Sequence, residues 1–192
     1  MLYQTHATVH LGNIHHNIQW IRDRVGKQRK ILIAVKANAY GHGAVEVSRM
    51  AEKIGVDWLG VATVPEAMQL RKAGINLPIL KFSPAFPEEM KAAILNNVTL
   101  AVCDIENIHT LQLACAAISR RINVHLKVDT GMGRIGVPVE EAAEMAIFIE
   151  HECPSLNLDG VFTHLPVSDK PDNAYTKEQI SRFSTTVDGI QS

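Results

Sequence analysis

A lysine that follows a short apolar run is the first residue whose surroundings suggest chemistry. Lys36 comes directly after residues 31–35 (ILIAV), a run too short for a comfortable helix and typical of a strand buried on both faces. Burial lowers the pKa of a lysine toward the range in which its free amine acts as a nucleophile or a base. The following residues 38–43 (NAYGHG) predict a tight strand-to-helix turn whose backbone N–H groups could hold a phosphate.

A second group of ionisable residues lies in residues 124–136 (VHLKVDTGMGRIG). In a strand, His125, Lys127 and Asp129 share one face, opposite three apolar side chains. If both faces are buried, the polar side chains are tolerated only when they pair with one another or bind a ligand. Arg134 follows among glycines that let the backbone approach a ligand, and its guanidinium is a permanently charged donor.

A third polar cluster ends the segment at residues 160–169 (GVFTHLPVSD). Its histidine, His164, is a candidate site residue, although a lone histidine at a strand end is more often a hydrogen-bonded core residue. The three cysteines, Cys103, Cys115 and Cys153, have no metal-type or redox-type spacing, so we expect reduced, mostly buried thiols. No histidine has convincing metal-ligand spacing, and we predict no metal site.

The composition narrows the class of protein. The chain has 192 residues, of which 46% are hydrophobic and 20% charged, as in a soluble globular domain with one sizeable core. A formal net charge of -1 gives no general attraction to nucleic acid or membrane, so we expect a small-molecule ligand. No secretory leader pattern and no bilayer-spanning run is found in the sequence, which predicts a cytoplasmic location.

Strand-like and helix-like segments alternate along the chain. We expect strands at residues 7–11, 31–35, 58–62, 79–83, 99–103, 122–128 and 158–164. We expect helices at residues 12–25, 44–54, 65–73, 87–96, 105–119, 139–152 and about 175–191. Repeated βα units predict an α/β fold of the (β/α)8 TIM-barrel type.

Only about six βα units can be counted from Lys36 onward, two fewer than a closed barrel needs. Six strands would leave two unpaired edges, which natural proteins avoid. We therefore expect residues 1–192 to form a barrel domain truncated after about six units. A complete short protein with a degenerate barrel is the alternative.

Two strings of residues resemble those of one enzyme family. Residues 35–43 (VKANAYGHG) and 128–136 (VDTGMGRIG) closely resemble motifs of the bacterial alanine racemases, and the resemblance runs collinearly along the chain. It implies the N-terminal barrel portion of a fold-type III enzyme that uses pyridoxal 5'-phosphate (PLP), with the C-terminal β domain absent. In that family the strand at residues 7–11 belongs with this C-terminal domain.

The resemblance also implies roles for single residues. Lys36 corresponds to the Schiff-base lysine and one catalytic base, and Tyr40 to a ligand of the cofactor phosphate. Arg134 corresponds to the arginine that contacts both the cofactor and the substrate carboxylate, and His164 to the histidine that packs against the PLP ring. Lys127 corresponds to a lysine carboxylated on its amine, an anion that would pair with Arg134.

The implied activity is interconversion of L- and D-alanine by proton abstraction and reprotonation, supplying D-alanine for the cell wall. The family works as a homodimer in which the partner's C-terminal domain supplies a tyrosine as second base. That domain is not found in this sequence, so we expect the chain alone to be inactive. Asp169 corresponds to an acidic position near the histidine.

Other functions stay open. Residues 165–168 (LPVS) depart from the small residues usual in the family, so serine or a broader set of amino acids is an alternative substrate. A non-catalytic PLP-binding barrel protein would also use a strand-end lysine but would not need Lys127 or residues 129–134. A related decarboxylase would share the apolar run into residues 35–38 but not the following YGHG. A structural or interaction module would bind no PLP.

Overall fold

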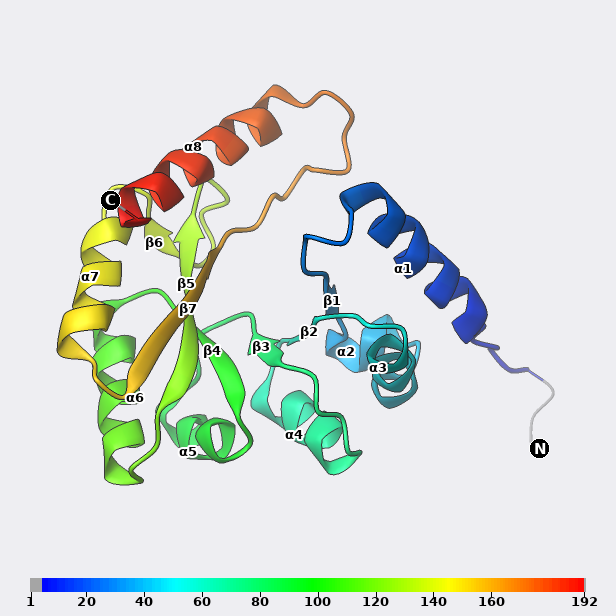
Figure 1. Cartoon of the computed structure of the whole chain (residues 1–192), viewed down its shortest axis with the longest axis horizontal. Coiled ribbons are helices and arrows are strands. Elements are labelled where there is room, and N and C mark those ends of the chain that lie inside the picture. The colour runs from blue at the N-terminus through cyan, green and yellow to red at the C-terminus, as the bar shows by residue number, and fades with distance from the viewer. Residues whose placement is uncertain (1–4, 192) are drawn as a thin grey trace. The chain divides into compact units, whose positions relative to one another are not determined.

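The computed structural model describes residues 5–191 and divides into two compact units, Met1–Leu80 and Lys81–Ser192 (Figure 1). The first unit holds α1 (Leu11–Val25), β1 (Leu32–Ala34), α2 (Lys36–Tyr40), α3 (Ala44–Lys53), β2 (Trp58–Val61) and α4 (Val64–Lys72). Strand β3 (Ile79–Lys81) lies at the boundary. The second unit holds α5 (Pro87–Leu95), β4 (Val98–Val102), α6 (Ile105–Ala117), β5 (Ile122–Asp129), β6 (Val137–Pro138), α7 (Ala142–Glu152), β7 (Leu156–Phe162) and α8 (Ala174–Gln191).

In the first unit β1 and β2 pair in parallel, with Leu32 opposite Trp58 and Ala34 opposite Gly60. The backbone N–H of Val35 extends this ladder by donating to the Gly60 carbonyl at 2.8 Å. Parallel strands need a crossover connection, which α3 provides. The carboxyl ends of β1 and β2 therefore lie side by side, and Lys36 follows the end of β1.

In the second unit β5 is the central strand. It pairs in parallel with β4, β6 and β7. The ladder with β7 shifts register after Val124, because Val124 lies opposite Leu158 whereas His125 lies opposite Gly160. Asp159 is thus the extra residue of a β-bulge, a feature that redirects side chains locally.

The core of each unit is built from the apolar faces of these strands and of the helices that follow them. Leu59, Val61 and Leu70 are at most 1% exposed in the first unit, and Leu126 and Ile149 are fully buried in the second. Burial of side chains of this size stabilises a fold by roughly 1.5–3 kcal/mol each. The predicted α/β class with parallel strands is confirmed, and most predicted elements agree with the structure within a few residues.

The structure differs from the predicted elements at two places. The strand predicted at residues 7–11 is wrong: residues 7–10 form no strand and Leu11 already begins α1, because no neighbouring strand among residues 5–191 pairs with this segment. The pair Val137–Pro138 lies outside every predicted element, yet it forms β6 against Val128 and Asp129. A two-residue strand carries no periodic signal, so only its pairing reveals it.

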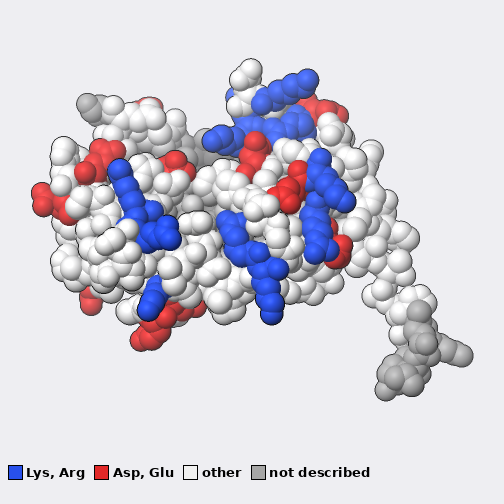
Figure 2. Space-filling model, turned by 60° about the horizontal axis from the view of Figure 1, so that its bottom comes forward, with Lys and Arg blue, Asp and Glu red and all other residues white. Residues whose placement is uncertain are grey.

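Charges of both signs are interspersed on the surface. Figure 2 shows lysine and arginine side chains lying among aspartate and glutamate on the face that it draws, in keeping with the net charge of -1. Across residues 5–191, no helix combines the length and the apolar character needed to cross a membrane.

Candidate active site

Lys36 lies at the carboxyl end of β1, as the sequence predicted. Val35 before it is 1% exposed, whereas the Lys36 side chain is half-buried. In barrel folds the carboxyl ends of the strands carry the reactive groups, because the loops that follow them are free to vary. The prediction of a strand buried on both faces is wrong for β1: Leu32 is 37% exposed and Ile33 and Ala34 are half-buried, because β1 is an edge strand in the described part of the chain. The Lys36 amine is therefore anchored by the buried Val35 and remains accessible.

The turn after Lys36 is left-handed. Residues 37–40 have positive φ values of 49°, 55°, 51° and 53°, so α2 is not a right-handed helix although its hydrogen bonds are helix-like. Left-handed backbone costs on the order of 1–2 kcal/mol per residue for side chains with a Cβ. Strain of this kind persists only where neighbouring contacts impose it, and it clusters at functional sites.

Hydrogen bonds within the turn hold this backbone. Gly41 N donates to Ala37 O at 3.0 Å, His42 N to Ala39 O at 3.0 Å and Gly43 N to Asn38 O at 2.9 Å. The Ala44 N–H donates to the Asn38 side-chain oxygen at 2.8 Å. The four successive amides are therefore occupied, and the expectation that N–H groups of this turn hold a phosphate is wrong for these four.

Tyr40 remains a candidate ligand of the cofactor phosphate. It belongs to the left-handed turn and is 60% exposed, so its side chain is accessible. Lys36 and Tyr40 both lie in the first unit. These two candidate residues therefore lie at the two ends of one short segment, α2.

Lys127 is buried on the inner face of β5. Its residue is 5% exposed, and its Nζ lies 4.5 Å from the centre of the Phe162 ring on the paired strand β7. Burial and the positive charge of Arg134 lower the pKa of Lys127, opposed by Asp129 and Cys103. A lysine in this setting gives up its proton more readily than a surface lysine.

His125 lies on the same face of β5 as Lys127. Its Nε2 is 3.6 Å from the bulge residue Asp159, while burial lowers the pKa of the imidazole. A Cβ on Gly160 would come within 2.9 Å of the ring, so this position accepts only glycine without movement. The predicted alternation of faces along β5 is confirmed by the burial of Val124, Leu126 and Val128.

The first part of the glycine-rich loop that carries Arg134 is held by hydrogen bonds at Gly131 and Gly133. The Asp129 carboxylate accepts hydrogen bonds from Gly131 N at 2.8 Å and Gly133 N at 2.7 Å. The Tyr175 hydroxyl, on α8, donates to the Gly131 carbonyl. Arg134 itself is exposed, so its guanidinium projects from a fixed loop.

His164 and Asp169 lie beyond β7, which ends at Phe162 rather than at His164 as predicted. Both side chains are exposed. The start of this loop is joined to the end of β5 by a 2.9 Å hydrogen bond between the hydroxyls of Thr130 and Thr163. Lys127, Arg134 and His164 therefore belong to one unit: Lys127 lies in β5, Arg134 follows β5, and His164 follows the paired strand β7.

Burial disfavours thiol chemistry. Cys103, Cys115 and Cys153 are free, and burial raises the pKa of Cys103 and Cys115 to about 11. A thiol with such a pKa is protonated at neutral pH and is a poor nucleophile.

Sequence reasoning missed two residues that organise the site. One is Tyr175, for which the sequence offers no signal. The other is Glu66, whose carboxylate binds the Ala37 amide at 2.7 Å. The Thr63-x-x-Glu66 spacing is that of a helix capping box, and this signal could have drawn attention to Glu66.

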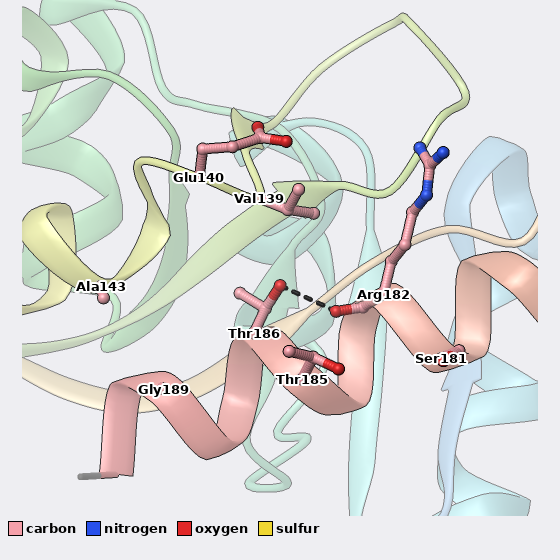
Figure 3. Close-up of a pocket in the computed structure, with 8 residues that line it drawn as sticks. All are labelled: Val139, Glu140, Ala143, Ser181, Arg182, Thr185, Thr186 and Gly189. Atoms are coloured by element: carbon pink, nitrogen blue, oxygen red, sulfur yellow. Dashed lines mark hydrogen bonds between the residues drawn. The ribbon is translucent and has the colours of Figure 1, made fainter.

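A pocket of about 390 Å³ lies between the start of α7 and α8. Figure 3 shows its lining, in which the Thr186 hydroxyl donates to the Arg182 carbonyl at 2.8 Å. The lining contains no predicted site residue. The predicted site residues thus lie at strand ends and not in this pocket.

Parallel strands followed by helices, with ionisable side chains beyond the carboxyl ends of the strands, define an α/β protein of the barrel-enzyme class. The family model for the alanine racemase N-terminal domain matches residues 9–192. The chain belongs to the alanine racemase family through this domain.

Relatives agree with this assignment. The chain is 46% identical over 189 residues to the alanine racemase of Cutibacterium acnes, covering 97% of this chain and 50% of that protein. It is 43% identical to the alanine racemase of Chlorobaculum tepidum, covering 92% of this chain and 46% of that protein. The chain therefore spans about half the length of these curated relatives.

Solved structures show the same architecture. The alanine racemase of Clostridium difficile 630 in complex with cycloserine matches with a TM-score of 0.95 at 33% identity, covering all of this chain and 52% of that chain. A histidine racemase from Leuconostoc mesenteroides matches with a TM-score of 0.82 at 28% identity, covering 91% of this chain and 46% of that chain.

Proposed function

We propose that this chain is the PLP-binding part of an amino-acid racemase that interconverts L- and D-alanine. The observation that carries the proposal is Lys36, an accessible amine that follows the buried Val35 at the end of β1, in a chain of the alanine racemase family. The chemistry of the donor groups fits the cofactor: an amine for its aldehyde, a phenol for its phosphate and a guanidinium for anionic oxygens.

Each residue then has a defined task. PLP, when bound, acts as an electron sink that makes the α-proton of an attached amino acid acidic. Lys36 Nζ carries the cofactor and moves the α-proton on one face of the substrate. Tyr40 donates to the cofactor phosphate, Arg134 binds the substrate carboxylate, and His164 packs against the cofactor ring.

The proposed assembly is a homodimer. Racemisation needs a second proton carrier on the opposite face, and we assign it to a further domain of the partner subunit. The units Met1–Leu80 and Lys81–Ser192 are then parts of one barrel domain. D-Alanine for the cell wall is the proposed product, and a cytoplasmic location follows from that role.

Two alternatives remain to be separated by experiment. The structural match to a histidine racemase supports the view that the same barrel can serve racemases of different amino acids. Residues 165–168 (LPVS) are the place where this chain departs from the small residues usual in the family. A serine or broader racemase is therefore the second candidate. A non-catalytic PLP carrier would leave Lys127 and Arg134 without a task.

The proposal is tested by adding PLP to the purified chain, recording its absorption spectrum and reducing it with borohydride. We expect a band near the visible edge that disappears when borohydride reduces the C=N bond to a stable amine, and we expect that reduced adduct to map to Lys36. An adduct spread over surface lysines, or none at all, would contradict the proposal. Addition of D- and L-alanine, serine and histidine to the loaded chain then ranks the substrates by their effect on the band.

Lys127 is proposed to carry a carbamate. Its neutral amine adds to CO2, so that an N–C bond forms, one proton leaves to solvent and the cation becomes an anion beside Arg134. The lowered pKa of Lys127 makes the neutral amine available at a lower pH than for a surface lysine. With ¹³C-labelled bicarbonate we expect a carbamate carbon signal that strengthens as pH rises through this lowered pKa.

The matched control for this experiment is an exposed lysine of the same unit. Lys127→Met should remove the carbamate signal, whereas Lys91→Met on α5 should leave it unchanged. A signal that survives in the Lys127→Met variant would refute the assignment.

A further inference from the structure

The left-handed turn after Lys36 is bound from outside by one carboxylate. Glu66 Oε1 accepts a hydrogen bond from Ala37 N at 2.7 Å, and Glu66 Oε2 accepts from Ala62 N at 2.8 Å and Thr63 N at 3.0 Å. All of these residues lie in the first unit. One side chain therefore joins the segment after β1 to the segment after β2.

The position of the Ala37 bond matters because of peptide geometry. The amide N–H of Ala37 belongs to the planar peptide that joins it to Lys36, so a hydrogen bond to that group restrains the rotation of the plane next to the Lys36 Cα. At the same point the chain leaves the β ladder and enters four residues of positive φ. The hydrogen bond to Ala37 N therefore lies at the point where the backbone changes from extended to left-handed conformation.

The hydrogen bonds from Ala62 N and Thr63 N fix the position of the Glu66 carboxylate. Ala62 and Thr63 follow β2, which is paired with β1 through Ala34 and Gly60. Glu66 also takes part in the cap of α4, where its own N–H donates to Thr63 Oγ1 at 3.3 Å, but the three bonds of its carboxylate do not involve that hydroxyl. The Ala37 amide is thus held against the sheet and not against a mobile loop.

We infer that Glu66 is a positioning residue for Lys36: its carboxylate holds the strained turn that aims the amine at the proposed cofactor. This inference rests on the proposed function of Lys36. A carboxylate is required because three N–H donors meet two oxygens, and an amide would present its own N–H groups to one side. An ordinary helix cap would need only the bonds to its own segment.

The test compares Glu66→Gln with two controls in the same unit. Glu52→Gln changes another carboxylate that accepts a backbone N–H, that of Asn76 at 2.9 Å, far in sequence from the turn. Thr63→Ala weakens the cap of α4 but keeps the hydrogen bond between the Glu66 carboxylate and the Ala37 amide. Hydrogen exchange of the Ala37 amide is measured without PLP, and the rate of borohydride-trapped PLP adduct at Lys36 is measured with it.

We expect Glu66→Gln to speed exchange at Ala37 and to slow adduct formation at Lys36 by about tenfold or more, because small misplacements of a reacting group are costly. Glu52→Gln and Thr63→Ala should leave both rates close to those of the native chain. If Glu66→Gln does not fold, Glu66→Asp retains the charge but is one methylene shorter, and it should show the same two changes.

Unchanged exchange at Ala37 would overturn the inference, and so would faster exchange with an unchanged adduct rate, since Glu66 would then be only structural. Thr63→Ala slowing the adduct as much as Glu66→Gln would also overturn it. A native chain with no adduct at Lys36 would overturn the proposed function together with the inference. A native adduct that Glu66→Gln forms equally fast would overturn the inference alone.

Discussion

Replacement of Lys36 by alanine is expected to remove the specific PLP adduct entirely. The remaining adduct should fall to the level given by surface lysines, and the band near the visible edge should be missing from the variant before reduction. The reason is that β1 and the left-handed turn present this one amine at the strand end, with Val35 buried before it. Absorption spectroscopy and peptide mapping after borohydride reduction measure the effect.

The control is Lys53→Ala, which removes an exposed lysine at the end of α3 in the same unit. It should form the adduct as the native chain does. Because alanine keeps the backbone preferences of residue 36, the midpoint of urea unfolding should change little in Lys36→Ala. An undiminished band in Lys36→Ala, with the adduct mapped to Lys127, would mean that the roles of the two lysines have been confused.

Most of the fold follows from sequence patterns because its elements have strong local signals. Helix α4 begins at a capping box with a proline in its first turn, and α1 ends at Gly26 with a φ of 81°. Strand β5 alternates between buried apolar residues and polar ones. These features depend on nearest neighbours along the chain, which is why the sequence predicts them.

The features that the sequence did not predict depend on partners far along the chain. Strand β7 ends at Phe162, where its pairing with β5 stops at Lys127, and the next two residues of β5 pair with β6. The segment of residues 7–10 has strand-like residues but no strand beside it in the described part of the chain. Pairing and not propensity therefore sets these boundaries.

The candidate site shows the same division. The lysines and Arg134 could be identified from their motifs, but the left-handed turn could not, since Ala37 and Ala39 have no preference for positive φ. The turn is bonded locally by the Asn38 side chain, which accepts from Ala44 N, and from a distance by Glu66, which follows β2 and accepts from Ala37 N. The contact with Glu66 is thus a tertiary one, located next to the candidate site residue Lys36.

Gly136→Ala is expected to cause the largest loss of stability, about 2–4 kcal/mol in the free energy of unfolding. A Cβ on Gly136 would lie 2.5 Å from Asp129 N and 2.7 Å from Val128 C, and its φ is +142°. These are backbone atoms of β5, so they cannot move aside as a flexible side chain would. Urea unfolding followed by circular dichroism measures the loss.

Gly133→Ala is the matched control, because Gly133 lies in the same loop with a φ of +69° but has no atom within 4 Å of the place where a Cβ would lie. Its free energy of unfolding should fall only by the cost of placing a Cβ on a residue with positive φ, on the order of 1–2 kcal/mol. The difference between the two variants isolates the contact between Gly136 and β5. Because β6 begins at Val137 and pairs with Val128, a clash at Gly136 also displaces the loop that carries Arg134. Equal losses in the two variants would mean that backbone freedom alone, and not this close approach, makes Gly136 necessary.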